Sequence, residues 1–412
     1  MSKARTSARA GANARQDSPI AASPDRVPRR IRMAHPYSAS ARSRAGRPCS
    51  ALRKPRRLRQ SLSFMELQVH GHPLHTRSLS ITLYAAEAES MRVSAELVDL
   101  RKRGFVPVGG DLQPAGIVHL MQLEAEVDFA ARRLRRIEAK QPRVAFEPSE
   151  RTAGESCRDP AGRLDALAGA GLGEGWARAV GERVGGPRGC THILTLAQLL
   201  GSTVSWALES DELRDFDSDA WPERAKLFRR DLIFDGYCED GRLQLVGQLT
   251  DLAFRPAAAV VAPLERFGGL YELRLVADVE TERFSIASLR AADRHRSIEG
   301  VATPWRDLGS DVADLVGTEL RAGVSATILR QLADRPEAQP LLAALLNLTP
   351  AYYQCLANLA EEVPFDVRHR ADVVGMGGLP GSCYMWRTDG ALHQLRTEPR
   401  HQNRHEPEEV KS

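Results

Sequence analysis

The sequence lacks the signals that mark most readily identified protein classes. No apolar run approaches the roughly 18 residues that a membrane-spanning helix needs, so a membrane protein is not expected. The 6 cysteines form no CxxC pair, which argues against a disulfide framework and favours a reducing cytoplasm. The motifs G-x-G-x-x-G, G-x-x-x-x-G-K-S/T, G-x-S-x-G and H-E-x-x-H are all absent. Any chemistry must therefore come from residues that these motifs do not mark.

Acidic residues are almost missing from the first 60 residues, which carry 16 Lys and Arg against only Asp17 and Asp25. The rest of the chain is acidic, holding 41 of the 57 bases and 51 of the 53 acids. Residues 1–64 have too little apolar surface to fold and are predicted to be a disordered basic leader. A targeting peptide and a nucleic-acid-binding arm are alternatives. We favour a tail without function or a misassigned start, with Met65 as the true first residue, because the acidic body offers no basic surface for nucleic acid.

An internal repeat is evident, because two stretches superpose without a gap after a shift of 152 positions. Most matched positions alternate, as the core-facing residues of strands do. A shift of 148 continues the match through a helical part and places residues 175–200 over residues 323–348. The matched pairs include Arg77 with Arg229, Ile81 with Ile233, Leu97 with Leu249, Asp99 with Asp251 and Val127 with Val279.

Each copy is predicted to be an α+β domain, in which a mainly antiparallel sheet is followed by helices. The first copy spans residues 65–209 and the second, degenerate copy residues 224–360, joined by a linker at 210–223 and followed by a tail at 361–412. Such a tandem duplication predicts an internal pseudo-dimer. In the first copy, strands are expected near 77–85, 91–100, 117–127 and 133–146, and helices near 161–171, 175–185 and 191–209. In the second, strands are expected near 229–235, 243–252, 269–279 and 282–292, and helices near 305–321, 323–333 and 338–360.

The block GWARAVGERVGGPRGCTH, residues 175–192, resembles the signature of an uncharacterised bacterial family, domain of unknown function 2889. Residues 75–77 and 234–251 look similar to that family too, and SCYMWRTDG, residues 382–390, resembles the segment that closes its single-domain members. The resemblance covers most of residues 75–390 and implies bacterial origin, but no established reaction. The closing segment follows only the second copy, so a site that includes Cys383 requires this segment to cross over to the first.

Cys190 and His192 are the strongest candidates for catalytic residues. A turn-forming run, residues 185–189, leads into an apolar stretch with helical spacing, so Cys190 is predicted at a helix N-terminus with Thr191 as a candidate cap. Backbone N–H groups and the helix dipole would lower the pKa of a thiol there. The imidazole could act as a base, or both side chains could bind a metal ion such as Zn²⁺. The alternative is a buried Cys packed beneath a turn, with His192 bonded to a carbonyl.

Several polar residues of the first copy have no counterpart in the second, which favours a functional role because both copies must fold. His119, within a predicted strand, is thus a third candidate catalytic residue, although a lone strand histidine is more often structural. His75, in a cluster with His70 and His72, and Cys157, ahead of the first helix, are further candidate metal ligands. Under the two shifts, Cys190 becomes Ala338, His192 becomes Pro340, His75 becomes Leu227 and His119 becomes Tyr271.

Two functions of different classes stay open at this point. One is a thiol- or metal-assisted hydrolase of a small ester or thioester, with Cys190, His192 and His119 in the active site. The other is a non-catalytic protein that binds a small molecule or serves as a scaffold, with the two copies as an internal pseudo-dimer. Convergence of the three side chains would favour the enzyme, and their separation would favour the binding protein.

Overall fold

A computed structural model describes ten segments of the chain, all within one compact unit. The predicted leader and Met65, the predicted start, lie outside the described residues, as do part of the predicted linker and most of the predicted tail. The described residues are 69–87, 90–103, 114–214, 221–240, 242–256, 263–281, 283–296, 303–320, 323–358 and 380–397.

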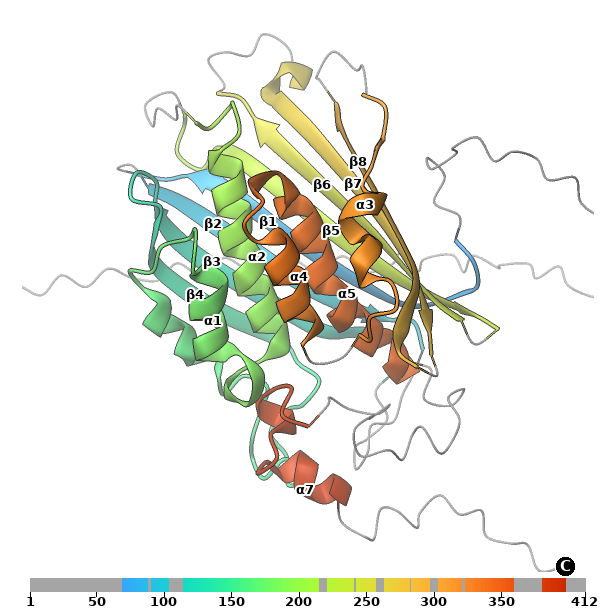
Figure 1. Ribbon diagram of the computed structural model, residues 1–412. Coiled ribbons are helices and arrows are strands. Elements are labelled where there is room, and N and C mark those ends of the chain that lie inside the picture. Colours follow the sequence, from blue (N-terminus) through green and yellow to red (C-terminus); the bar gives the residue numbers. More distant parts are fainter. Residues whose placement is uncertain are drawn as a thin grey trace, which may run out of the picture. The chain divides into compact units, whose positions relative to one another are not determined.

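The described chain builds one nine-stranded sheet in the order β4-β3-β2-β1-β5-β6-β7-β8-β9 (Figure 1). All neighbouring strands are antiparallel, and β1 pairs with β5 at the centre, so both predicted copies contribute to one continuous sheet. The first half comprises β1 (His72–Ala85), β2 (Ser90–Arg101), β3 (Gly116–Asp128) and β4 (Arg133–Arg143). The second comprises β5 (Lys226–Glu239), β6 (Arg242–Phe254), β7 (Phe267–Glu280) and β8 (Ser285–Arg296), with the short β9 (Arg306–Asp307) at the edge.

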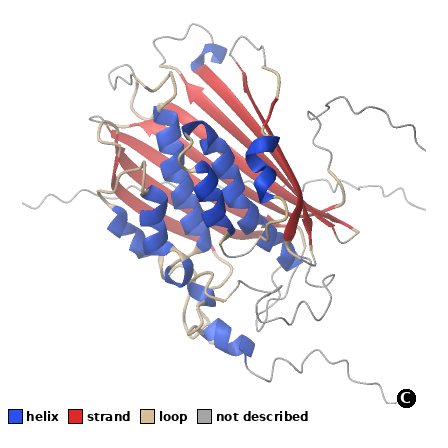
Figure 2. Ribbon diagram, in the orientation of Figure 1, coloured by secondary structure: helices blue, strands red, loops and turns tan. Residues whose placement is uncertain are grey.

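Helices gather on one face of this sheet, as Figure 2 shows, which confirms the predicted α+β class with a mainly antiparallel sheet. The long helix α2 (Thr191–Leu208) packs on β1, β2 and β3, and α5 (Gln339–Asn358) packs on β1, β5 and β6 and also contacts α2. The shorter helices are α1 (Trp176–Val184), α3 (Gly309–Val312), α4 (Val324–Leu332) and α7 (Ala391–Thr397). In the part of the chain that is described, no helix is long and apolar enough to cross a membrane.

Alternation along the strands explains why helices cover only one face. In β1, Leu79, Ile81 and Leu83 are buried toward the helices, whereas Ser78 and Ser80 between them point to the other face. Leu97 of β2 and similar residues of the other strands extend this apolar layer, which burial of apolar surface stabilises against chain entropy. Toward one end of β1, β2 and β3 the inward-facing positions change from apolar to polar, and this is where the candidate site lies.

The register of β5 differs from the sequence prediction by one residue. Asp99 lies opposite Arg77, and Asp251 lies opposite Arg230 rather than Arg229. A shift of one residue turns a side chain to the other face of the sheet. Accordingly Arg230 is buried, whereas Ile233 is 36% exposed. The predicted matches of Arg77 with Arg229 and of Ile81 with Ile233 are therefore wrong, and the positions that correspond are Arg230 and Phe234.

Candidate functional site

The polar end of the inward face is centred on Asp99 of β2, which is fully buried. Arg77 of β1 lies directly opposite Asp99 on one side, and His119 of β3 lies opposite it on the other. Paired residues of antiparallel strands point to the same face, so these three side chains share one space beneath the helices. His75, two residues before Arg77, points there too, and its Nε2 lies 3.4 Å from Oδ1 of Asp99.

The N-terminus of α2 brings Cys190 and His192 onto this group. Cys190 is the N-cap residue of α2, where the sequence predicts it. Gly189 must be glycine, because a Cβ there would collide with the carbonyl oxygen of Val184. Nε2 of His192 lies 3.0 Å from Oδ2 of Asp99, and its Nδ1 lies 3.7 Å from Sγ of Cys190. The rings of His192 and His119 are 3.9 Å apart between centroids. The structure thus brings together Cys190, His192, His119 and His75.

Three potential metal ligands converge within this group. One potential ligand atom from each of Asp99, His119 and His192 lies within 4.8 Å of the other two. Nδ1 of His119 is 3.3 Å from Oδ2 of Asp99. Yet neither carboxylate oxygen nor this Nδ1 has an aligned hydrogen-bond partner among the described residues. Ligand atoms of a tetrahedral Zn²⁺ site with bonds of about 2.0 Å lie about 3.3 Å apart. The distances from Oδ2 of Asp99 to the two imidazole nitrogens, 3.0 Å and 3.3 Å, are compatible with such an ion.

Gln354 of α5 contacts the same nitrogen of His192. Its amide Nε2 lies 3.2 Å from Nε2 of His192. When that amide donates, Nε2 of His192 is an acceptor and cannot also donate to Asp99. An imidazole nitrogen has one lone pair, so a metal ion can bind Nε2 of His192 only if the amide of Gln354 turns away from it.

Burial sets the protonation states at this site. It lowers the pKa of His75 to about 4, and with His119 it lowers the pKa of His192 to about 3, so both imidazoles are neutral at pH 7. Burial would raise the pKa of Asp99, but Arg77 and the imidazoles outweigh it and hold that pKa well below its usual range. A neutral imidazole and an ionised carboxylate are the forms that bind metal ions.

The sequence predicts a lowered pKa for the thiol of Cys190, and this prediction is wrong. Complete burial raises its pKa, and this effect exceeds the opposing effect of the backbone N–H groups of His192 and Ile193. Cys190 is therefore a protonated thiol at neutral pH. Thr191 does not cap the helix either, because its hydroxyl donates to the carbonyl of Ser382 at 3.1 Å.

The closing segment crosses over to the first half of the sheet, as a site near Cys383 requires. The backbone N–H of Tyr384 donates to the carbonyl of Gly189 at 2.7 Å, and Arg387 forms an ion pair with Glu155. Cys383 and Cys157 pack together with Met385 and Trp386 in a small apolar cluster. The described residues of the closing segment thus lie over the N-terminus of α2, while Cys157 packs beside that segment rather than in the Asp99 group.

Three residues of this site were not predicted. Asp99 and Arg77 are charged residues at inward-facing strand positions, where Leu97 and Leu79 set the apolar pattern. That interruption is a usable signal, because a buried charge is costly unless it has a partner. Gln354 lies 162 residues from His192, and no local pattern in the sequence connects the two.

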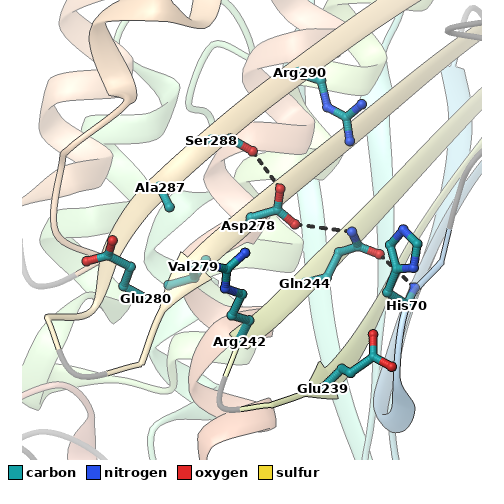
Figure 3. Close-up of a pocket in the computed structure, with 10 residues that line it drawn as sticks. All are labelled: His70, Glu239, Arg242, Gln244, Asp278, Val279, Glu280, Ala287, Ser288 and Arg290. Carbon is teal, nitrogen blue, oxygen red and sulfur yellow. Dashed lines mark hydrogen bonds between the residues drawn. The ribbon is translucent and has the colours of Figure 1, made fainter. Parts of the chain in front are cut away.

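A pocket of about 470 Å³ lies on the other face of the sheet (Figure 3). Its polar groups are bonded to one another: Ser288 donates to Asp278 at 2.6 Å, Gln244 donates to Asp278 at 3.1 Å, and the N–H of His70 donates to Gln244 at 3.3 Å. His70 therefore belongs to this pocket and is separated from His75 by the sheet.

Comparison with known proteins gives one family. The family model described as "Protein of unknown function (DUF2889)" matches residues 75–205. No curated protein and no solved structure matches the chain. The matched segment contains Arg77, Asp99, His119, Cys190 and His192, so what this chain shares with that family is the segment that forms the site.

Proposed function

We propose that Asp99, His119 and His192 bind a divalent transition-metal ion, best matched by Zn²⁺, and that the site hydrolyses a small ester or thioester. The observation that carries this proposal is the convergence of one carboxylate oxygen and two imidazole nitrogens, of which the oxygen and Nδ1 of His119 lack aligned hydrogen bonds among the described residues. An ion with three protein ligands keeps a position for water or substrate, and it would supply Lewis-acid activation there.

Other residues of the chain would position these ligands. The thiol of Cys190 lies beside Nδ1 of His192, so this nitrogen can carry the proton while Nε2 presents its lone pair. Gln354 of α5 lies beside the same ring, and its amide would turn away from Nε2 when an ion binds there. A metal-assisted route fits the site better than a thiolate nucleophile, because burial raises the pKa of Cys190.

The register at the centre of the sheet supports the tandem duplication as part of this proposal. Leu79 of β1 lies opposite Leu232 of β5, and each faces a corresponding leucine on its other side, Leu97 of β2 and Leu249 of β6. Two such hairpins joined edge to edge are what an internal pseudo-dimer would produce. We infer that the second copy completes the sheet and supplies α5, in a bacterial cytoplasmic protein.

A non-catalytic role is the second candidate, and the burial of the site favours it. The side chains of Asp99, His119 and His192 are 0%, 6% and 16% exposed, respectively. Such enclosure suits a structural ion or a tightly held ligand as well as a reaction. In that case the ion would stabilise the fold without any turnover.

Hydrolysis of p-nitrophenyl acetate and of an acyl thioester by the full-length protein separates the two candidates. The enzyme proposal expects turnover that EDTA abolishes, that Zn²⁺ restores and that His192→Gln removes. His295→Gln, which replaces an exposed histidine of β8 remote from Asp99, is the matched control and should keep full activity. Zinc-loaded protein without turnover on any ester or thioester would contradict the hydrolase and leave the metal-binding protein.

A further inference from the structure

Arg77 and Arg230 stand in the same relationship to an aspartate on the neighbouring strand. Arg77 lies opposite Asp99, Arg230 lies opposite Asp251, and both arginines are 1% exposed. In the second pair, Nε of Arg230 donates to Oδ1 of Asp251 at 2.7 Å and Nη2 donates to Oδ2 at 2.6 Å. This is the bidentate contact through which a guanidinium binds a carboxylate most strongly.

The first pair does not make this contact. Only Nη1 of Arg77 approaches Asp99, at 3.7 Å from Oδ1, which is too far for a hydrogen bond. Nε and Nη2 of Arg77 have no hydrogen-bond partner among the described residues. These are the same two atoms that hold the carboxylate of Asp251 in the other pair. The carboxylate of Asp99 faces His119 and His192 instead.

Other groups around Arg77 also contribute positive charge to this buried region. Arg101 is a second cation that interacts with Asp99. The positive end of the 18-residue helix α2 also lies at this site, because its N-cap residue Cys190 adjoins His192. A buried guanidinium without an aligned acceptor is unfavourable, so an additional negative group would be stabilised at this site.

We propose that Arg77 binds the carboxylate group of a small organic acid through Nε and Nη2, in the way that Arg230 binds Asp251. The substrate class of the proposed hydrolase would then be esters or thioesters that carry a free carboxylate. This assignment of substrate rests on the proposed function, whereas carboxylate binding by Arg77 does not depend on the metal ion. A planar, bidentate fork is specific for this ligand geometry, which a lysine ammonium cannot reproduce.

Calorimetric titration of the full-length protein with acetate tests the inference, with and without Zn²⁺. We expect binding in both conditions, a loss of about tenfold or more in affinity for Arg77→Lys, and no change for the matched control Arg230→Lys. Binding of acetate to metal-free protein, with no uptake of Zn²⁺, would refute the proposed function and keep the carboxylate site. Wild-type protein that does not bind acetate, or Arg77→Lys protein that binds it unchanged, would overturn the inference.

A measurement without substitution covers the case in which Arg77→Lys does not fold. Nε–H resonances of arginine can be followed by NMR in ¹⁵N-labelled wild-type protein. Acetate should shift the Arg77 resonance and slow its exchange with water, and it should leave the Arg230 resonance unchanged. Equal responses of both resonances, or none, would overturn the inference as well.

Discussion

Nε2 of His192, at the start of α2, lies 3.0 Å from Oδ2 of Asp99 in the middle of the sheet. This single approach joins the helical layer to the strands at the one place where the inward face of β1, β2 and β3 is polar. Nδ1 of His119 and Nε2 of His192 both face this same carboxylate oxygen, so the three groups can act on one bound ion or ligand. The predictions below test what this arrangement does.

Asp251→Asn should lower stability strongly without affecting metal binding. The substitution leaves Arg230 buried beside a neutral amide, and loss of one partner of a buried ion pair costs about 3–5 kcal/mol. Denaturant unfolding monitored by circular dichroism measures this change, and zinc content is determined on the same sample. A variant as stable as the wild type would contradict the structural role assigned to this pair.

Metal-free protein should lose stability as the pH falls below about 6.5. The pKa of His75 is about 4 and that of His192 about 3 in the folded protein, against 6.5 in the unfolded chain. Between these values the unfolded chain binds more protons, so each histidine lowers the free energy of unfolding by about 1.4 kcal/mol per pH unit. Denaturant titrations in EDTA across this range should show the effect. His192→Asn should reduce the slope by about half, and an unchanged slope would contradict the assigned burial.

Cys190→Ser should retain both the metal ion and hydrolysis. The thiol has a raised pKa and lies beside Nδ1 of His192, outside the three metal ligands. We therefore expect the activity of the variant on the same ester to lie within about threefold of the wild type. In the wild-type protein, Cys190 should react slowly with alkylating reagents. Complete loss of activity with the metal still bound would point to Cys190 as a nucleophile.

Much of the fold could be predicted because the strands alternate and the long helix α2 follows a turn. The prediction was wrong at single residues, where the register of a strand or the burial of a side chain was misjudged. Arg229 and Arg230 are adjacent, both could match Arg77, and only the pairing of β5 with β6 shows that Arg230 is buried. The low pKa expected for Cys190 followed from its place at a helix N-terminus, but the degree of burial depends on distant segments that the sequence does not place.

The site was only partly predictable, because its decisive contacts also join segments that lie far apart in the sequence. His119 and His192 are residue types that often act as catalysts or metal ligands, whereas Asp99 was only matched with Asp251 and was not singled out as a site residue. The two aspartates do occupy corresponding strand positions. What separates them is their partners, a bidentate arginine for Asp251 and two imidazoles for Asp99, and this difference becomes visible only when helix and sheet are packed together.

Trp386→Ala should release the closing segment and expose Cys190. Trp386 is buried with Met385, and Tyr384 and Ser382 hold the segment against Gly189 and Thr191. Truncation of a buried tryptophan costs about 3–5 kcal/mol, enough to raise the alkylation rate of Cys190 by more than about tenfold. Mass spectrometry of alkylated peptides measures this rate. Trp305→Ala, next to β9, is the matched control, and equal rates in both variants would contradict the covering role.

Titration of metal-free protein with Co²⁺, a spectroscopic substitute for Zn²⁺, tests the central claim most directly. We predict one ion per chain, with the visible absorption of a tetrahedral site that contains nitrogen and oxygen ligands. Asp99→Asn and His119→Gln should each abolish this absorption, whereas Asp251→Asn should retain it. A folded wild-type protein that binds no ion, or an ion whose spectrum survives Asp99→Asn, would contradict the account.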